Sequence, residues 1–412
     1  MTGWWGRWSG IVGIVAGLTA GHAVMAQEAP QGWSAPLPES VPNLRQEWRD
    51  VITVLAGYAK KRNPNFLLVM RGGVELLVRG SREVQWDQVM DPIGQNADKR
   101  LPLGATFRPF LNLFDGMIFD GLYCGETALG QPLDAAIKDR LAEDAEIARE
   151  KAQGIERPLP GIMDGPYSPD PKAEAAAEER IRHQADLADR KRRMVRAAAA
   201  VRDVGRPLFS IDDCSSDSNL AAAYRNADRD HVVTFATRGD PRLDRIPPGH
   251  PVHENATDVR TLPQVRTLLF NPVGDRFGSK EEWLAALAAT SYDAIVIDVA
   301  WRNTGLITKT DVARLKYKNL GGPRLVLAQL PMGRAFDGRW YWQAGWQPGN
   351  PSFLFAVDTH QPGAYIVDAQ DPGWREILGK TLAGIMDLGF DGVVMDDLDW
   401  YLWFEDITPL DQ

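Results

Sequence analysis

Apolar runs of strand length alternate along this chain with amphipathic stretches of helix length. From Leu44 to Tyr58 the apolar residues recur every three or four positions, which predicts a helix over about residues 42–61. The apolar run Phe66–Met70 follows and ends at Arg71-Gly72-Gly73, as a strand entering a turn does. Further strands are predicted at 116–119, 208–211, 232–236, 266–270, 294–298, 324–330, 364–367 and 393–395. Further helices are predicted at about 280–290, 309–317 and 373–388.

Continuous apolar strands that alternate with helices are typical of a parallel sheet covered by helices. Nine or ten strands in this pattern come close to a (β/α)8 barrel with an accessory strand or two. A doubly wound open sheet is the weaker alternative, because no glycine-rich phosphate loop follows any strand. We therefore expect an α/β protein with a TIM barrel, built as a single domain from residues 27–412.

Two segments interrupt the alternation. Residues 126–203 are rich in Ala, Glu, Arg and Lys and predict two exposed helices, 133–153 and 172–203, inserted between barrel strands. Such charged helices usually form a solvated face, so we assign this insertion no chemistry; a partner-binding arm is the alternative. Residues 239–263 contain repeated prolines and indicate a linker.

The amino terminus has the pattern of a secretory signal. Arg7 precedes the apolar run Ile11–Ala20, and Val24-Met25-Ala26 is a small-residue cleavage site. We expect residues 1–26 to be removed and the protein to be periplasmic or secreted, with no stable membrane insertion. An uncleaved membrane anchor is the alternative.

Composition narrows the classes of ligand. The net charge of −9 argues against nucleic acid and suits a cationic or neutral ligand, although ordinary solubility charge is the simpler explanation. Six His without an H-E-x-x-H pattern, and two Cys without C-x-x-C, argue against a zinc site. The carboxylates of Asp396-Asp397-Leu398-Asp399 are of a kind that holds Ca²⁺ or Mg²⁺, but they lack the spacing of an EF-hand, so we expect no metal. No G-x-S-x-G motif of a serine hydrolase is present. We expect no cofactor.

The candidate chemistry gathers near the carboxyl end of the chain. The strand Val393–Met395 leads into Asp396, Asp397 and Asp399, and the carboxyl ends of barrel strands are where active sites form. An aromatic cluster follows and predicts a surface on which sugar rings stack: Trp400, Tyr401, Trp403 and Phe404. A barrel strand is normally followed by a helix, whereas this chain ends soon afterwards, at Gln412.

Residues 265–405 resemble glycoside hydrolase family 114, the endo-α-1,4-polygalactosaminidases and their bacterial relatives. The stretches that carry this resemblance are Tyr292–Asp298, Leu325–Ala328, Gly333 with Ala335, Arg339–Trp342, Asp371–Arg375 and Phe390–Tyr401. Residues 46–237 resemble, more weakly, the part of the family that follows the F-D-G-V strand. Those matches are Asn63–Phe66, Glu75–Leu77, Phe114–Gly116 and Pro207–Asp213.

Together the two resemblances imply a circularly permuted barrel. The helix at 42–61 then takes the place after the last strand, and the linker 239–263 joins what are ordinarily the family's termini. Duplication is the alternative, but the two halves do not repeat each other. In the permuted barrel, Cys124 and Cys214 follow neighbouring strands, which makes a disulfide plausible; two buried thiols are the alternative.

The resemblance assigns the two catalytic carboxylates of a glycosidase to Asp396 and Asp120. Asp120 stands where the family has Glu, which retracts the carboxyl group by roughly a bond length and places turnover in question. Two further departures are Arg334, in place of an acid, and Arg71-Gly72, in place of Gln-Asn.

The remaining candidate site residues match family positions or adjoin the carboxylates and would bind substrate: Asp298, Asp399, Asp213, Arg339, Tyr401, Trp400 and Arg71. Asp298 and Asp213 have helix capping as an alternative role, and Arg339 an ordinary ion pair. The expected function is that of an exported glycoside hydrolase that cleaves an amino-sugar, galactosamine-containing polysaccharide. A non-catalytic polysaccharide-binding protein of the same barrel lineage is the alternative.

Overall fold

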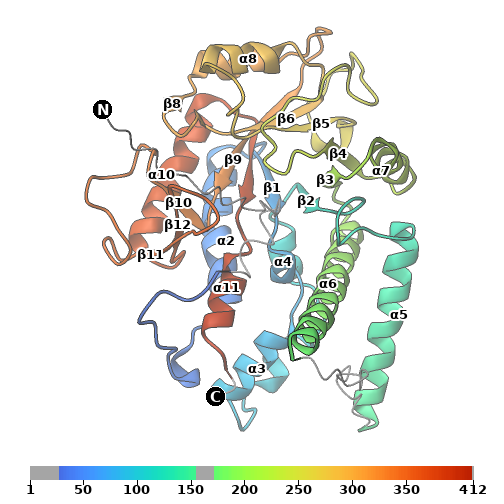
Figure 1. Ribbon diagram of the computed structural model, residues 1–412, viewed down its shortest axis with the longest axis vertical. Coiled ribbons are helices and arrows are strands. Elements are labelled where there is room, and N and C mark those ends of the chain that lie inside the picture. The colour runs from blue at the N-terminus through green and yellow to red at the C-terminus, as the bar shows by residue number, and fades with distance from the viewer. Residues whose placement is uncertain (1–26, 155–170, 411–412) are drawn as a thin grey trace, which may run out of the picture.

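A large parallel sheet forms the centre of the computed structural model, which describes residues 27–154 and 171–410 (Figure 1). The predicted signal segment 1–26 lies outside the described residues. The sheet has eight strands. They are β1 (Leu67–Arg71), β2 (Gly116–Asp120), β3 (Leu208–Cys214), β4 (Val233–Arg238), β5 (Leu268–Phe270), β6 (Ala294–Ile297), β9 (Leu325–Pro331) and β13 (Gly392–Asp396).

The strands are ordered β4-β3-β2-β1-β13-β9-β6-β5, and every hydrogen-bonded pair is parallel. The last strand, β13, therefore lies between the first strand, β1, and β9. The edge strands β4 and β5 approach each other to within 8 Å between Cα atoms but are not hydrogen-bonded. The sheet is thus nearly closed and barrel-like, as expected, and strands that follow one another around the sheet follow one another in the chain.

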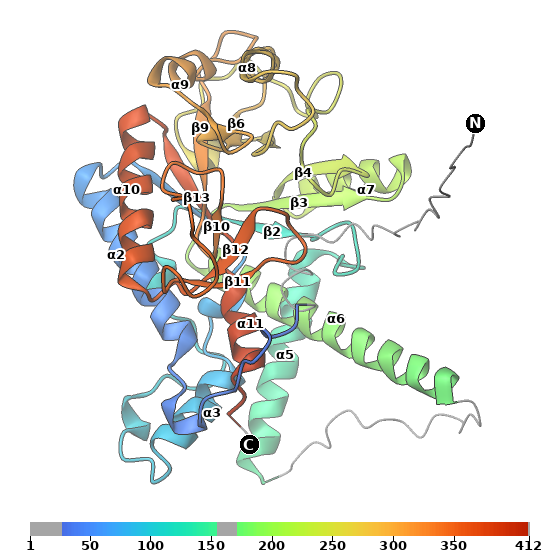
Figure 2. The same cartoon turned by 60° about the vertical axis from the view of Figure 1, so that its left-hand side comes forward.

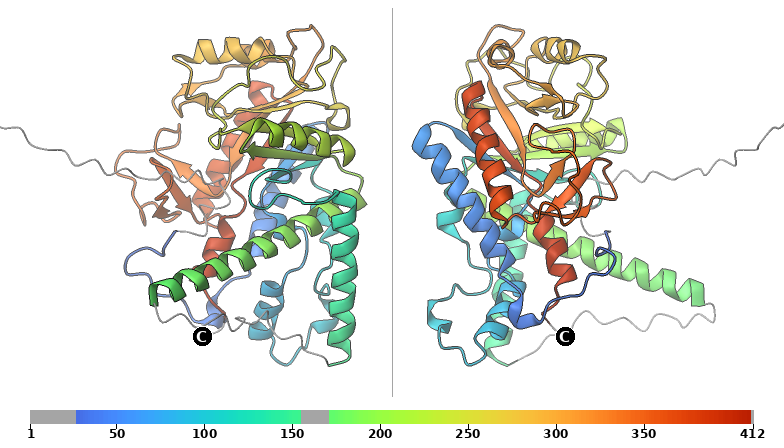
Figure 3. Two further views of the ribbon diagram at one scale, coloured as in Figure 1. Left: turned by 45° about the vertical axis from the view of Figure 1, so that its right-hand side comes forward. Right: turned by 90° about the vertical axis from the view of Figure 1, so that its left-hand side faces the viewer.

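Four helices lie in the chain between consecutive strands of the sheet, and a fifth, α2 (Leu44–Arg62), precedes β1. The four are α7 (Asp217–Arg229), α8 (Lys280–Ala288), α9 (Lys309–Leu315) and α10 (Pro372–Leu388). The Asn43 side chain accepts a hydrogen bond from the Gln46 N–H at the start of α2, and Asp371 does the same for Gly373 at the start of α10. Gly389, with φ 87°, ends α10 in the left-handed conformation that glycine adopts without strain. Figure 3 shows α2 and α10 side by side.

The remaining helices are α3 (Ser81–Met90) and α4 (Arg108–Leu111) between β1 and β2, α5 (Leu133–Ala152) and α6 (Pro171–Asp203) between β2 and β3, and α11 (Trp400–Ile407) after β13. Helices α5 and α6 confirm the two helices predicted for the insertion between β2 and β3, and α6 extends well away from the sheet (Figure 2). Helix α11 follows β13 directly, so the last strand does have a helix after it.

Short antiparallel elements complete the fold. The accessory sheet has the order β10-β12-β11, with β10 (Arg334–Phe336), β11 (Leu354–Val357) and β12 (Ala364–Val367). Strands β7 (Ala300–Trp301) and β8 (Gly305–Leu306) form a hairpin. The 3-10 turns are η2 (Pro38–Ser40), η3 (Val74–Leu76), η4 (Ala97–Lys99) and η5 (Leu262–Gln264). The strand predicted at 364–367 therefore exists, but it belongs to the accessory sheet.

The predicted linker 239–263 contains the start of η5 and no other helix or strand. Among the described residues, no helix is both long enough and apolar enough to cross a membrane.

Candidate functional site at the carboxyl end of the barrel

Arg71 joins the two carboxylates that the sequence assigns to catalysis. It ends β1, whose neighbours in the sheet are β13 and β2, and these strands end in Asp396 and Asp120. The Arg71 Nη1 donates to Asp396 Oδ2 at 2.9 Å, while Nη2 donates to Asp120 Oδ1 at 3.0 Å. The Arg71 Nε also donates to both Asp120 oxygens, at 3.2 and 3.1 Å. The structure therefore brings Asp120 and Asp396 together, separated by the width of one guanidinium.

The guanidinium of Arg71 is also enclosed by the barrel. Its side chain is 9% exposed, and its central carbon lies 4.7 Å from the ring centroid of Phe270 at the end of β5. The two adjacent carboxylates raise the pKa of Arg71 above its usual value, although burial opposes them. Arg71 is therefore a fixed positive charge, and both carboxylates accept charge-assisted hydrogen bonds from it.

Asp396 and Asp120 differ in their access to solvent. Asp396 is 3% exposed, and its carboxylate also accepts hydrogen bonds from Gln329 Nε2 at 2.5 Å and from the Asp397 N–H at 2.8 Å. The Asp120 side chain is 31% exposed. Asp120, and not Asp396, is the carboxylate that a ligand from solvent can reach.

Asp120 opens into a pocket at the carboxyl ends of β1, β2 and β3, which we call the mouth pocket. Its volume is about 190 Å³, and charged side chains from the barrel line it. They are Arg71, Glu75, Asp120, Asp213, Asp240 and Asp399. Four of the predicted site residues, Arg71, Asp120, Asp213 and Asp399, therefore share this pocket.

Asp399 is the second carboxyl group of interest in the mouth pocket. It comes directly before α11, and its Oδ1 accepts a hydrogen bond from the Gly73 N–H at 2.7 Å. Burial, and next the negative charge of Glu75, raise the pKa of Asp399 to about 7. Asp399 is thus placed to exchange a proton near neutral pH, in the same pocket as the arginine-bound Asp120.

Two other arginines pair with strand-end carboxylates, as Arg71 does. Arg334 donates to both oxygens of Asp397, at 2.9 and 2.6 Å, and Nη1 reaches Asp358 Oδ2 at 3.1 Å. Arg339 binds both oxygens of Asp298, one of them at 2.6 Å from Nη1. These pairs neutralise charge at the carboxyl ends of β13 and β6.

Neither Asp298 nor Asp213 caps a helix. Asp298 precedes the β7–β8 hairpin and holds Arg339. Asp213 Oδ1 accepts hydrogen bonds from Thr237 Oγ1 at 3.2 Å and from the Asp240 N–H at 3.0 Å. Arg339 is engaged in an ion pair with Asp298, and whether it also binds substrate stays a prediction.

The aromatic cluster after β13 is not a stacking surface. Trp400 is 2% exposed, and Tyr401 and Trp403 are fully buried. The rings pack edge-on against one another and against Phe355, and the Tyr401 hydroxyl donates to Glu75 Oε2 at 2.8 Å. The prediction that Trp400 and Tyr401 contact substrate is therefore wrong, because a ring without exposed area offers no face to a sugar. Trp403 and the half-buried Phe404 pack against Phe355 of the accessory sheet, whereas Tyr401 packs against Trp48 of α2.

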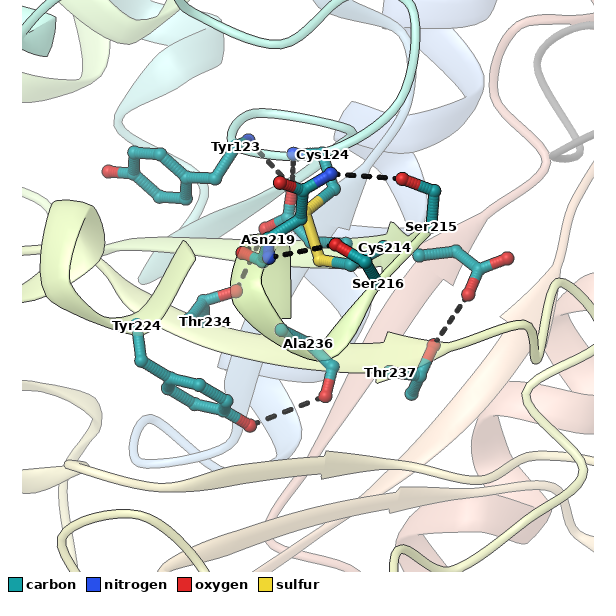
Figure 4. Close-up of a disulfide and its surroundings, with 12 residues drawn as sticks. Tyr123, Cys124, Cys214, Ser215, Ser216, Asn219, Tyr224, Thr234, Ala236 and Thr237 are labelled. Atoms are coloured by element: carbon teal, nitrogen blue, oxygen red, sulfur yellow. Dashed lines mark hydrogen bonds between the residues drawn. A yellow bond between two sulfur atoms is a disulfide. The ribbon is translucent and has the colours of Figure 1, made fainter. Parts of the chain in front are cut away.

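The expected disulfide is present between Cys124 and Cys214, with Cα atoms 5.1 Å apart (Figure 4). It joins the chain after β2 to the end of β3, and Cys124 also lines the mouth pocket. The Asp212 Oδ1 accepts hydrogen bonds from the N–H groups of Tyr123 and Cys124 beneath it. The disulfide therefore fixes the loop after Asp120, from which the inserted helices begin.

The insertion also supplies part of the site, which the sequence interpretation missed. Arg190, Arg193 and Met194 of α6 line the mouth pocket. The signal was present in the sequence, since this part of the helix changes from charged residues to the apolar run that follows Met194. Within the described residues, no group of three or more His, Cys, Asp or Glu side chains is arranged to hold a metal ion.

Comparison with known proteins identifies short related segments. No protein family model matches the chain. An uncharacterized protein of Deinococcus radiodurans is 42% identical over 78 residues, 19% of this chain and 25% of the relative. One of Methanocaldococcus jannaschii is 29% identical over 122 residues, 29% of this chain and 34% of the relative. One of Thermotoga maritima is 34% identical over 73 residues, 18% and 23% of the two chains. The matches span about a quarter to a third of these relatives.

Proposed function

We propose that this protein is an exported glycoside hydrolase that cleaves an amino-sugar, galactosamine-containing polysaccharide in the mouth pocket. One observation carries the proposal: the pocket combines Asp120, a carboxylate bound to Arg71, with Asp399, whose pKa is about 7. Glycoside hydrolysis needs one carboxylate and one carboxylic acid, held in environments that separate their proton affinities. The acidic lining of the pocket also suits a cationic sugar chain.

In this proposal Asp399 donates a proton to the glycosidic oxygen while Asp120 acts on the anomeric carbon, as a nucleophile or through a water molecule. Arg71 holds Asp120 in place. Asp396, which the family resemblance marks as catalytic, then has the role of holding Arg71, because its carboxylate is buried behind the guanidinium.

A second candidate is a polysaccharide-binding protein of the same barrel lineage that does not hydrolyse its ligand. The bridging position of Arg71 favours it, since a carboxylate engaged in three hydrogen bonds to a guanidinium is a weaker nucleophile and base than a solvated one. Sugar binding in the mouth pocket is common to both candidates.

The deciding experiment is oligosaccharide release from galactosamine-containing polysaccharide, measured by mass spectrometry. We expect products from the wild type and at least a roughly hundredfold loss in Asp120→Asn and Asp399→Asn, the scale of removing a general acid or base. Asp396→Asn should lose less of this activity. An equal loss would show that Asp396 is catalytic, as the family resemblance predicts. Polymer binding without products in every variant would establish the binding protein instead.

We propose in addition that the barrel is circularly permuted relative to the usual order of its family. The seam between β4 and β5 supports this, because it is the one place where neighbouring strands of the described sheet are not hydrogen-bonded. The linker 239–263 crosses this seam, and the first and last strands are paired with each other.

A further inference from the structure

The inserted helix α6 is joined to the barrel, at the edge of the mouth pocket, by an ion pair between Arg193 and Glu75. The Arg193 Nε lies 2.5 Å from Glu75 Oε1, and Arg193 also pairs with Asp189 on its own helix. Glu75 belongs to η3, just after β1, and its other oxygen accepts the hydrogen bond of Tyr401. One buried carboxylate therefore connects the insertion, the barrel and α11.

Glu75 lines the same pocket as Asp399, the proposed proton donor, and the Gly73 N–H, two residues before Glu75, donates to Asp399 Oδ1 at 2.7 Å. After burial itself, the negative charge of Glu75 is the largest influence on the proton affinity of Asp399. The negative charges of Asp120 and Asp396, both of which are paired with Arg71, act on Asp399 in the same direction, and the Tyr401 hydroxyl of α11 also interacts with Asp399. Glu75 in turn faces Arg193 from α6, Tyr401 from α11 and Arg45 from α2.

We propose that Arg193 is a positioning residue that acts through Glu75 on Asp399, so that the inserted hairpin sets the pH range of the site. This inference rests on the proposed role of Asp399 as proton donor. The Glu75 side chain is only 6% exposed, and solvent therefore screens little of its charge. Arg193 opposes that charge and binds Glu75 Oε1, while Tyr401 binds Oε2, so the two partners fix the carboxylate from both sides.

The charge of the pair predicts the direction of each effect. Glu75→Gln removes a negative charge beside Asp399, which then loses its proton more easily. Arg193→Ala removes the cation that pairs directly with Glu75, while Arg45 stays paired with Glu405, so more of the Glu75 charge acts on Asp399, which then holds its proton more tightly. Because Arg193 acts only through Glu75, Arg193→Ala should have no effect when Glu75 is already Gln.

The test follows the titration of the Asp399 carboxyl carbon by NMR in protein labelled at aspartate, with Asp399→Asn identifying the signal. We expect the midpoint to fall by about one pH unit in Glu75→Gln and to rise by a similar amount in Arg193→Ala. The alkaline limb of hydrolysis should move in parallel. The double variant should match Glu75→Gln, and Arg193→Lys should stay close to the wild type.

Arg192→Ala is the matched control, since Arg192 is the adjacent residue of α6 and also pairs with Asp189, but it does not line the pocket. It should leave the Asp399 midpoint unchanged. An Arg193→Ala shift that persists when Glu75 is Gln would overturn the proposal, because Arg193 would then act directly. If Arg193→Ala fails to fold, an unchanged midpoint in Glu75→Gln overturns it equally. Loss of all hydrolysis with the predicted NMR shifts would refute only the proposed function.

Discussion

Arg71 is the residue that most changes the chemistry expected of the site. The resemblance to glycoside hydrolases predicts two carboxylates facing a substrate, and here a buried guanidinium lies between them. A buried charge is tolerated when it is paired and hydrogen-bonded, as Arg71 is on both sides. Two negative charges and one positive charge thus lie at the ends of three adjacent strands. The stability of the barrel and the proposed function depend on the same contacts of Arg71.

Removing the Arg71 side chain should be strongly destabilising. Arg71→Ala leaves Asp120 and the buried Asp396 without their cation, and breaking a buried pair on one side typically costs about 3–5 kcal/mol. Urea unfolding at neutral pH measures the loss. Part of it should return in Arg71→Ala/Asp396→Asn, because the second change removes one of the stranded charges. The exposed Arg192→Ala should change stability by less than about 0.5 kcal/mol; a similarly small loss for Arg71→Ala would contradict this account.

Asp399 should make stability depend on pH. Its pKa of about 7 in the folded protein lies above the value of about 3.9 expected in the unfolded chain. The folded state therefore binds the proton more tightly, and the resulting stabilisation is complete below about pH 3.9 and is lost as pH rises through about 7.

The comparison that isolates this effect is wild type against Asp399→Asn, by urea unfolding at intervals between pH 4 and 8. Asparagine does not ionise, so the variant should gain stability relative to the wild type as pH rises, and the difference should level off above about pH 7. Other groups cancel in the difference. A stability difference that is the same at every pH would show that Asp399 titrates normally.

At the scale of elements, the apolar pattern predicted the barrel strands and most of the helices that cover them. Continuous apolar runs such as Val393–Met395 are strands because both faces of a parallel strand are buried. The accessory sheet could not be predicted from this pattern. The run 364–367 has the same composition as a barrel strand, and only its antiparallel neighbours assign it elsewhere.

The candidate site could be predicted only in part, for a physical reason. The strand-end positions of Asp120, Asp213 and Asp396 follow from the pattern, because carboxyl ends of parallel strands share one edge. The direction in which each side chain points does not follow from the apolar pattern. Trp400 and Tyr401 adjoin the carboxylates in sequence, yet α11 turns them into the core. Arg193 is distant in sequence and reaches the pocket because α6 packs against η3.

The burial of α11 gives a direct test of the corrected role of its aromatic rings. Trp403 is fully buried and its Nε1 donates to the Gln27 carbonyl at 2.7 Å, so Trp403→Ala should destabilise the protein by about 3–5 kcal/mol. Trp340, which is 50% exposed, is the matched control, and Trp340→Ala should change stability by less than about 0.5 kcal/mol. Thermal or urea unfolding gives both values. If the Trp403→Ala protein had normal stability and weakened sugar binding, the original prediction that these rings stack on sugars would be supported after all.

At the scale of the whole molecule, the two ends of the described chain lie together beside the barrel. The Trp33 Nε1 donates to the Ile407 carbonyl at 3.1 Å, and Gln27 contacts Trp403 and Val357. The break in the ladder of strands lies elsewhere, between β4 and β5. In a closed barrel every pair of neighbouring strands is hydrogen-bonded. The permutation proposal explains the break between β4 and β5 as the place where the termini of the family's ordinary barrel lie.

A relinked protein tests that explanation. Leu410 is joined to Gln27 by a short flexible linker, and the new termini are placed within 239–263, which has no strand and only the start of η5. The eight-stranded sheet keeps all of its hydrogen-bonded pairs, so we expect a folded protein with the circular dichroism spectrum of the original chain and an intact mouth pocket.

The matched control carries the same link between Leu410 and Gln27, but its new termini are placed after Pro331. There the Met332 N–H donates to the Asp396 carbonyl at 3.0 Å and the chain passes directly into β10. This control should unfold at clearly lower urea concentration. If the two relinked proteins were equally stable, or if only the control folded, residues 239–263 would not be the natural junction of the barrel.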